Sequence, residues 1–202
     1  EQKIKEGECT RIATGASCFQ FAAGTITAYY GYEGNNSANM ACPRNVVIPE
    51  TIDGQSVVTI GDISFTSRQL TSVRVLNSVT SINYGAFAYN DITSVTLGNS
   101  VETIGFGAFV GNPLKTITLP NSVTTIAGSA FESVPLESIT FSDSLVSIGA
   151  AAFSEHRLTT LTLPGALTTI GNDAFQGGTL TSLTVPGSVT SIGNGAFSVN
   201  KL

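Results

Sequence analysis

The chain has 202 residues, of which 42% are hydrophobic and only 11% are charged, and its formal net charge is −5. This length fits one domain of ordinary size, and the composition is too apolar for a disordered chain. The acidic balance, without a basic cluster, argues against nucleic-acid binding, which depends on phosphate contacts. No apolar run approaches the roughly 18 residues of a membrane-spanning helix.

The first 45 residues differ from the rest of the chain. Residues 1–16 are polar and predict a short helix or a flexible arm. Residues 18–21 and 25–30 predict two strands joined by a turn at 22–24, and residues 34–41 predict a loop. Because the first unit of a repeat protein exposes apolar surface, it needs a cap. We therefore expect residues 1–45 to form an arm and a β-hairpin cap.

All three cysteines, Cys9, Cys18 and Cys42, lie in this region. An odd number cannot pair completely within one chain, and the spacing of a zinc site is missing. One disulfide in an exported protein is the better interpretation. We predict a Cys18–Cys42 bond that joins the hairpin to the first repeat strand, with Cys9 free or paired outside the chain. Cys9–Cys18 and Cys9–Cys42 are the alternatives.

The remaining residues repeat with a period of 22. Residues 46–69 form an irregular first unit, in which residues 50–55 widen a turn, and residues 70–202 contain six full units and the first residue of another. Four columns recur at this spacing: Phe65, Phe87, Phe109, Phe131, Phe153, Phe175 and Phe197; Leu70, Ile92, Leu114, Leu136, Leu158, Leu180 and Leu202; Ile60, Ile82, Ile104, Ile126, Ile148, Ile170 and Ile192; Ala86, Ala108, Ala130, Ala152, Ala174 and Ala196.

Each unit has the pattern of a coil of a solenoid. Residues 114–119 alternate apolar and Thr side chains, as in a strand with one buried face. Pro120 ends the strand, Ile126 belongs to a second inward-facing segment, and glycines such as Gly105 favour a left-handed backbone or a close approach. We expect the Ala-Phe pair to lie on one helical or 3₁₀ turn.

One unit cannot bury its own apolar residues, so the copies must stack. We predict a right-handed, curved leucine-rich-repeat solenoid of mixed α/β class. Its parallel sheet would lie on the concave face with short helical turns opposite, and Phe109, Phe131 and Phe153 would form one buried stack.

Residues 180–197, with a leading Leu, then S-V-T-S-I-G, then A-F, resemble the BspA-like leucine-rich repeats. Residues 45–61 resemble the first unit of that family, and the likeness covers residues 45–202. The resemblance implies a bacterial or protist surface protein that binds host proteins, other cells or a matrix. The family is defined by its fold, so a ligand does not carry over. The chain departs from the family in lacking a cysteine in each repeat.

Catalysis has little support in the sequence. The only histidine, His156, lies in the segment where the units differ most, which favours an exposed loop. The glycines of residues 105–107 belong to the repeat turn and not to a phosphate loop. We therefore expect no enzyme activity, no cofactor and no metal site.

The outward strand positions are mostly Ser and Thr and would line up on one face. Arg74 is the only charged residue among these strand positions, and in the variable segments that follow each Phe of the six units Tyr89 is the only aromatic residue. Tyr and Arg side chains are enriched at binding hot spots. We predict that a ligand binds near the N-terminal end of the concave face, at Arg74, Tyr89, Asn90, Asp91, Ser94, Thr96, Thr116, Thr118 and Thr140.

The sequence thus predicts an adhesin-like binding module, extracellular or on the cell surface, that recognises a protein or glycan of a host or neighbouring cell. A structural spacer for another module is the alternative, and ice binding by the Thr ladders is a remote third. Leu202 begins a unit that no capping sequence follows, so we expect further modules in the full-length chain. No nucleic-acid binding and no membrane insertion of this segment are expected.

Overall fold

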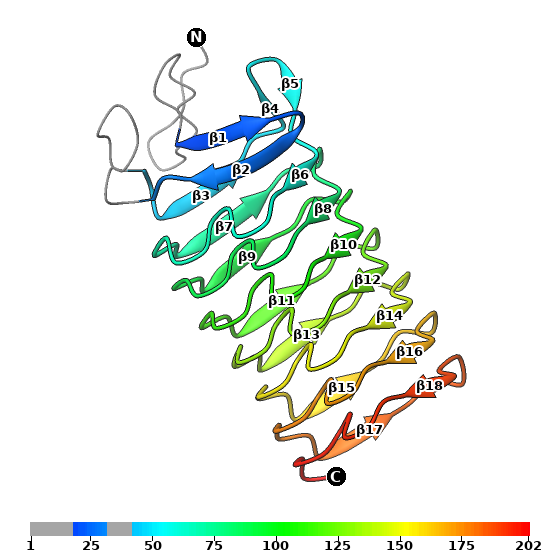
Figure 1. The fold of residues 1–202 in the computed structure, drawn as a ribbon. Helices are drawn as coiled ribbons and strands as arrows, with labels where there is room; N and C mark the ends of the chain where they lie inside the picture. Colours follow the sequence, from blue (N-terminus) through cyan, green and yellow to red (C-terminus); the bar gives the residue numbers. More distant parts are fainter. Residues whose placement is uncertain (1–17, 32–41) are drawn as a thin grey trace.

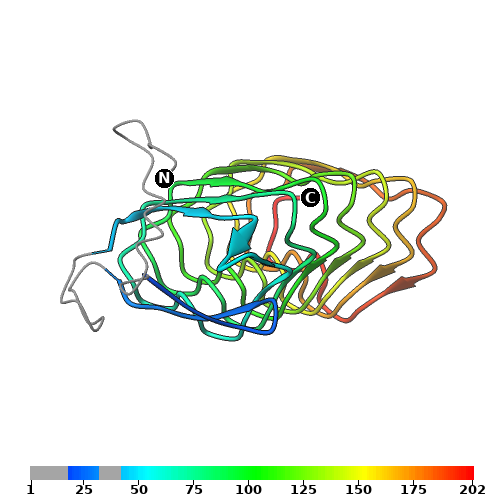
Figure 2. The same ribbon diagram turned by 90° about the horizontal axis from the view of Figure 1, so that it is seen from above.

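The computed structural model describes residues 18–31 and 42–202 and shows an elongated β-solenoid. Its coils stack along one axis, with the first hairpin at one end and the C-terminus at the other (Figure 1). Seen from above, successive coils overlie one another (Figure 2). The repeat of 22 residues is therefore one turn of the solenoid, as the sequence predicts.

The longest sheet has nine strands in the order β1-β2-β6-β8-β10-β12-β14-β16-β18, and all its pairs except β1-β2 are parallel. The register pairs each Ile of a two-residue strand with the same Ile of the next coil. The strands are β1 (Phe19–Ala22), β2 (Thr25–Tyr29), β6 (Thr59–Ile60), β8 (Ser81–Ile82), β10 (Thr103–Ile104), β12 (Thr125–Ile126), β14 (Ser147–Ile148), β16 (Thr169–Ile170) and β18 (Ser191–Ile192).

The strands that open the units form three short parallel sheets instead of the single sheet we predicted. Their bounds are β3 (Asn45–Ile48), β7 (Ser72–Val75) and β9 (Ser94–Thr96) in the first, β11 (Thr116–Thr118) and β13 (Ser138–Thr140) in the second, and β15 (Thr160–Thr162) and β17 (Ser182–Thr184) in the third. The predicted parallel pairing is confirmed, but at these strands it is divided into three separate sheets.

Glycine follows most of the shorter strands, where neighbouring coils approach closely. A Cβ on Gly105 would lie 2.7 Å from the Ile82 carbonyl oxygen, although Asn83 and Ala127 hold the same position after β8 and β12 and make the corresponding backbone bond. The backbone φ of Gly105 is not in the left-handed region, which identifies close approach, and not backbone conformation, as the reason for glycine here.

The irregular first unit carries a small antiparallel hairpin of β4 (Thr51–Ile52) and β5 (Gln55–Ser56). Asp53 and Gly54, both with positive φ, make its turn. Figure 1 shows this hairpin projecting from the N-terminal end of the stack. The extra residues that widen the turn in the sequence therefore form an outgrowth of an otherwise regular coil.

The Ala-Phe segments form turns, and the described residues contain no α- or 3₁₀-helix, so the predicted helical turns are absent. The Phe109 N–H donates to the Ala130 carbonyl of the next coil, and the Phe131 N–H donates to the Ala152 carbonyl (2.8 Å each). Residues before each Ala, such as Gly107 and Ser129, have positive φ. Backbone donors that bond the next coil, combined with a left-handed residue in each turn, prevent helix formation.

The phenylalanine column forms one continuous stack, as predicted. Neighbouring rings from Phe65 to Phe197 have centroids 4.9–5.5 Å apart, and from Phe65 to Phe175 the side chains are fully buried. Each buried aromatic or aliphatic side chain contributes about 1.5–3 kcal/mol through loss of apolar surface from water. Because every ring contacts the coils on both sides, the stack holds neighbouring units in register.

The β1–β2 hairpin lies against the first coil. The Tyr29 ring stacks on Phe65 at 5.0 Å and thereby continues the phenylalanine column. The predicted Cys18–Cys42 disulfide is present, and it joins the start of the hairpin to the segment before β3. Cys9 and the predicted arm lie outside the described residues, as does the whole predicted loop at 34–41.

Candidate functional site

The Ser and Thr side chains that alternate with the buried residues of the longer strands face solvent, as the sequence predicts. Ser94, Thr96, Thr116, Thr118 and Thr140 are all exposed. Within the sheets the hydroxyls align in register, since Ser72 pairs with Ser94 across β7 and β9, and Thr118 pairs with Thr140 across β11 and β13. These side chains define a surface that we call the Ser/Thr face.

The Ser/Thr face is opened between β9 and β11, where no strand pairing joins the first short sheet to the second. A groove of about 420 Å³ lies there, lined by Thr93, Ser94, Val95, Thr96, Leu97, Asn99, Thr116, Ile117, Thr118 and Pro120. Backbone groups on the two facing strand edges take no part in a ladder, so they can bond a ligand. The structure thus brings four of the predicted binding residues together in one groove.

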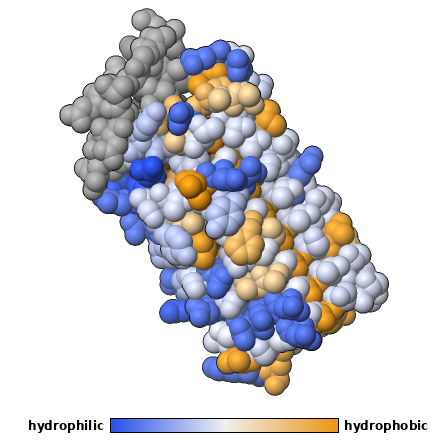
Figure 3. All heavy atoms as spheres, viewed as in Figure 1, coloured by the Kyte–Doolittle hydropathy of each residue, from blue (hydrophilic) through white to orange (hydrophobic). Residues whose placement is uncertain are grey.

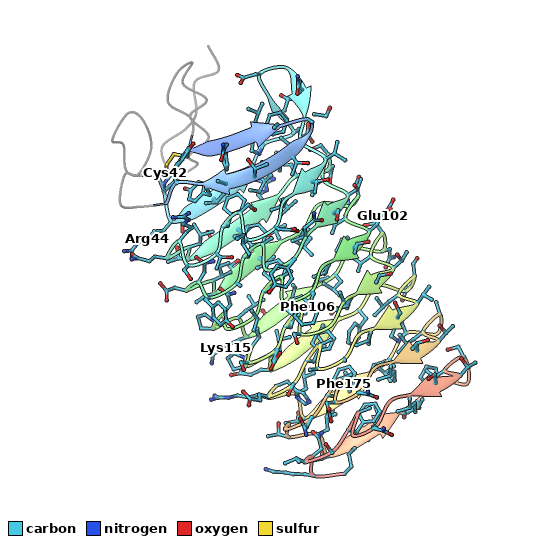
Figure 4. All side chains as sticks on the ribbon, viewed as in Figure 1. Cys42, Arg44, Glu102, Phe106, Lys115 and Phe175 are labelled. Atoms are coloured by element: carbon cyan, nitrogen blue, oxygen red, sulfur yellow. A yellow bond between two sulfur atoms is a disulfide. The ribbon has the colours of Figure 1, made fainter. Side chains whose placement is uncertain are left out.

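Charged side chains lie at the margins of this groove. Arg74 is exposed on β7, one strand away from β9. Lys115, labelled in Figure 4, makes an exposed ion pair of 2.9 Å with Glu137. The groove floor itself carries hydroxyl, amide and backbone groups beside short apolar side chains, which is a neutral polar surface for hydrogen bonding.

Asn90 is not available to a ligand, contrary to our prediction. Its side chain is buried, and its amide nitrogen donates to the carbonyls of Phe65, Phe87 and Ala88 at 2.8–3.1 Å. Its amide oxygen accepts from two backbone N–H groups, those of Arg68 and Leu70. Asn90 therefore holds two coils together.

Two other asparagines of the same column repeat this role. Asn112 donates to Phe87 and Phe109, and Asn200 donates to Phe175 and Phe197, each to carbonyls one unit apart. The column falls in the segments that vary most between units, so the sequence carries only a weak signal for it. A buried Asn that bonds the carbonyls of two phenylalanines is visible only once the coils are stacked.

Tyr89 and Asp91 are exposed on the turn that follows Phe87, which is a different side of the coil from the strands. A Cβ on Gly111 would lie 2.7 Å from the Tyr89 ring, so this ring lies across the backbone of the next coil. The Asp91 N–H donates to the Leu70 carbonyl at 2.9 Å. The predicted binding residues therefore do not form one site: the Ser and Thr residues lie on the Ser/Thr face, whereas Tyr89 and Asp91 lie on this turn.

His156 is buried and does not lie on an exposed loop, so that expectation is wrong. Its Nδ1 accepts a hydrogen bond of 3.0 Å from the Leu158 N–H, and its ring meets Phe175 edge-on. Burial lowers the pKa of His156 below its ordinary value of 6.5. It therefore fills, as a neutral imidazole, the column that Asn90 and Asn112 occupy in other units.

The structure also reveals a surface feature that our sequence analysis missed. Tyr84 and Phe106 occupy the same position of neighbouring units, both are exposed, and their rings stack with centroids 5.8 Å apart. The later units have Gly128, Ala150 and Asn172 at this position. Two aromatic residues in a column that is otherwise small or polar were the available signal.

Other kinds of site find no support in the described part of the chain. Residues 18–31 and 42–202 contain no group of three or more His, Cys, Asp or Glu side chains arranged to hold a metal ion. Within the same ranges, no helix has the length and apolar character needed to cross a membrane.

Comparison with known proteins gives a consistent result. A search among curated proteins finds no match. The fold is similar to that of the pneumococcal vaccine antigen PcpA, with a TM-score of 0.63 and 26% identity over 70% of this chain and 40% of that one. It is also similar to a leucine-rich cell surface protein of Faecalibacterium prausnitzii, with a TM-score of 0.57 and 24% identity over 96% of this chain and 53% of that one. The chain therefore spans about half the length of these relatives or less.

The model of the family described as "BspA type Leucine rich repeat region (6 copies)" matches residues 38–134 and 81–202. Those residues include the coils that form the phenylalanine stack, the short parallel sheets and the groove between β9 and β11. The chain belongs to the BspA-type leucine-rich repeat family.

Proposed function

We propose that the chain is a binding module of a bacterial surface protein and that it recognises an extracellular protein or glycan through the Ser/Thr face. The groove between β9 and β11 is the observation that carries this proposal. The family, together with the similarity to a pneumococcal protein that is named as a vaccine antigen, supports an extracellular location.

The chemistry of the groove fits a ligand rich in hydroxyl or amide groups. Ser94, Thr96, Thr116 and Thr118 each offer a hydroxyl that can donate and accept. Their β-carbons are exposed on short strands held by a rigid stack, so binding requires little ordering of the protein. Arg74 adds a cation beside Thr96, suited to an acidic group on the same ligand.

The groove favours binding of this kind over the third candidate, ice binding. An ice lattice needs a long row of evenly spaced hydroxyls, whereas the breaks after β9 and after β13 interrupt the row. The groove between β9 and β11 is, in contrast, concave and combines apolar side chains with a few polar groups, as ligand sites commonly do.

The proposal can be tested with immobilised fibronectin, fibrinogen, laminin and collagen and with a glycan array. We expect at least one of these probes to bind the chain. The double variant Thr96→Arg, Thr118→Arg, which fills the groove with two long side chains, should weaken that binding at least tenfold, or about 1.4 kcal/mol. Arg74→Thr should weaken it as well, because it removes the cation next to Thr96.

The matched control is Thr162→Arg, Thr184→Arg, which changes two positions of the same column on β15 and β17. Those positions are equally exposed but lie outside the groove. Binding that the control variant reduces as much as the groove variant would contradict the assignment. Absence of binding to every probe by the wild-type chain would support the alternative that the module is a spacer.

A further inference from the structure

We propose that Tyr84 and Phe106 form a second binding site, a stacking surface for the sugar rings of a neutral, β-linked glycan chain. This site is on the turn side of the coils, away from the Ser/Thr groove, and it does not depend on the function proposed for that groove. The two side chains are 56% and 52% exposed, far more than the buried phenylalanines of the core.

The two rings are nearly parallel and overlap in an offset stack. Their planes differ by 15° and their centroids are 5.8 Å apart. A Cβ on Gly128 would lie 3.1–3.2 Å from two atoms of the Phe106 ring, so that ring lies across the Gly128 backbone. The ring thus lies between the Tyr84 ring and the Gly128 backbone, and about half of the side chain remains exposed to solvent (Phe106 is labelled in Figure 4). Glycine at position 128 therefore gives the ring the room it needs.

Ile63, Tyr84 and Phe106 make a continuous strip over three neighbouring coils. The Ile63 N–H donates to the Tyr84 carbonyl, and the Gly85 N–H donates to the Phe106 carbonyl (2.8 Å each). A Cβ on Gly85 would lie 3.3 Å from Ile63, which is itself exposed. Beyond Phe106 the strip continues as the small residues Gly128 and Ala150. Figure 3 shows hydrophobic and weakly polar side chains side by side on the near face of the stack.

The chemistry of this strip selects carbohydrate among the ligands that an exposed apolar surface can bind. The face of a pyranose ring that carries axial C–H bonds packs on the π-face of an aromatic ring, and parallel exposed faces can receive successive sugars. The distance from one coil to the next is close to the length of one sugar residue in an extended β-linked chain. A chain lying along the stack would thus place neighbouring sugars on neighbouring rings.

Charge and hydrogen bonding point to the same ligand. The five residues of the strip are uncharged, but the exposed Asp62 holds the position of Tyr84 in the preceding unit. Its carboxylate can accept a hydrogen bond from a sugar hydroxyl, and together with the net charge of −5 it disfavours an acidic polymer. The Tyr84 hydroxyl lies at the strip, and the neighbouring Asn83 accepts from the Ser81 hydroxyl at 2.8 Å through its amide oxygen. The Asn83 amide nitrogen can then donate to a sugar hydroxyl.

Calorimetric titration with cellohexaose and chitohexaose, with the α-linked maltohexaose as the contrast, tests this proposal. We expect at least one β-linked hexasaccharide to bind with a Kd of about 1 mM or lower and to bind more tightly than maltohexaose. Tyr84→Ala and Phe106→Ala should each weaken binding by about two- to tenfold, the scale of one aromatic stacking contact. Tyr84→Phe should retain most of the affinity, because it keeps the ring.

Two control variants show whether glycan binding depends on the strip itself. Val199→Ala removes an exposed apolar side chain far along the stack and should leave the affinity unchanged. Thr96→Arg, Thr118→Arg should also leave it unchanged, because the groove is a different site. Melting temperatures of all variants near the wild-type value would show that the fold is intact.

Three results would overturn the proposal. The first is no detectable binding of either β-linked hexasaccharide, and the second is binding that survives the double Tyr84→Ala, Phe106→Ala variant or that the groove variant abolishes. The third comes from sedimentation of the chain alone: a monomer–dimer equilibrium that the double variant removes would identify the strip as an interface between two copies.

Discussion

Replacing Asn112 by valine removes the side chain that joins two coils at the centre of the stack. Asn112 is 2% exposed, and its amide nitrogen donates to the carbonyls of Phe87 and Phe109 at 2.9 Å. Its amide oxygen accepts from the Ile92 N–H at 3.2 Å. Among the hydrogen bonds of the described residues, the Phe109 carbonyl and the Ile92 N–H have no other partner, whereas the Phe87 carbonyl also accepts from Asn90.

The magnitude of the effect follows from this count. A third carbonyl, that of Val110, receives a long bond of 3.4 Å from Asn112, but it already accepts from the Tyr89 N–H. Two buried groups therefore lose their partner, and the Phe87 carbonyl loses one of two bonds. At about 1 kcal/mol or more for each of these three losses, Asn112→Val should lower the free energy of unfolding by about 3 kcal/mol. For a chain of this length the melting temperature should fall by about 6–12 °C.

Valine at this position is not intrinsically incompatible with the fold, because the third full unit carries Val134 in the same column. There the backbone provides one of the bonds, since the Val134 N–H donates to the Phe131 carbonyl, the counterpart of the Phe109 carbonyl. The segment around Asn112 has no such arrangement in the structure. The expected loss therefore depends on the backbone that surrounds this asparagine.

Equilibrium unfolding in urea, followed by circular dichroism, measures this loss. Asn77→Ala is the control, because Asn77 is exposed and accepts a single hydrogen bond from the Asn99 N–H. We expect the control to lose less than about 1 kcal/mol. If Asn112→Val loses no more than Asn77→Ala, the buried asparagine column does not stabilise the stack.

Three further predictions concern stability. Phe131→Ala should lower the free energy of unfolding by about 3–5 kcal/mol, because the ring is buried and stacked at 5.3 Å on both sides. Phe197→Ala, at the half-buried end of the column, should lower it less in the same urea assay. Equal losses would contradict a stabilising role of the stack. The double variant Cys18→Ser, Cys42→Ser should have a free energy of unfolding about 3 kcal/mol lower, as expected for a disulfide between residues 24 apart. A reductant should lower the melting temperature of the wild type as much as the double substitution does. Burial holds the pKa of His156 below 6.5 in the folded state, so the unfolded chain binds this proton more readily, and stability present above pH 6.5 is lost as the pH falls. Thermal melts at about pH 7.5 and 5 should therefore show a smaller loss for His156→Asn than for the wild type, and an equal loss would count against a buried neutral imidazole.

The sequence by itself determined the coil, the core and the unit length. Phe109, Phe131 and Phe153 recur every 22 residues, and a side chain so large can leave water only by packing on its copy in the next unit. The buried column, the exposed Ser/Thr side chains and the Cys18–Cys42 bond were all predictable from the chain alone. Local alternation of apolar and polar residues is sufficient to assign the inward and outward sides of each strand.

Only the tertiary structure decided how neighbouring coils bond to each other. The same strand pattern recurs in every unit, yet β9 and β11 are unpaired while β11 and β13 are paired, which creates the groove. Whether Asn90 faces solvent or bonds two carbonyls, whether His156 is buried, and whether the Tyr84 and Phe106 rings meet also depend on the adjacent coil. These features arise from contacts between residues about one period apart. The position of one coil on the next is set by packing along the whole stack and not by the residues of one unit.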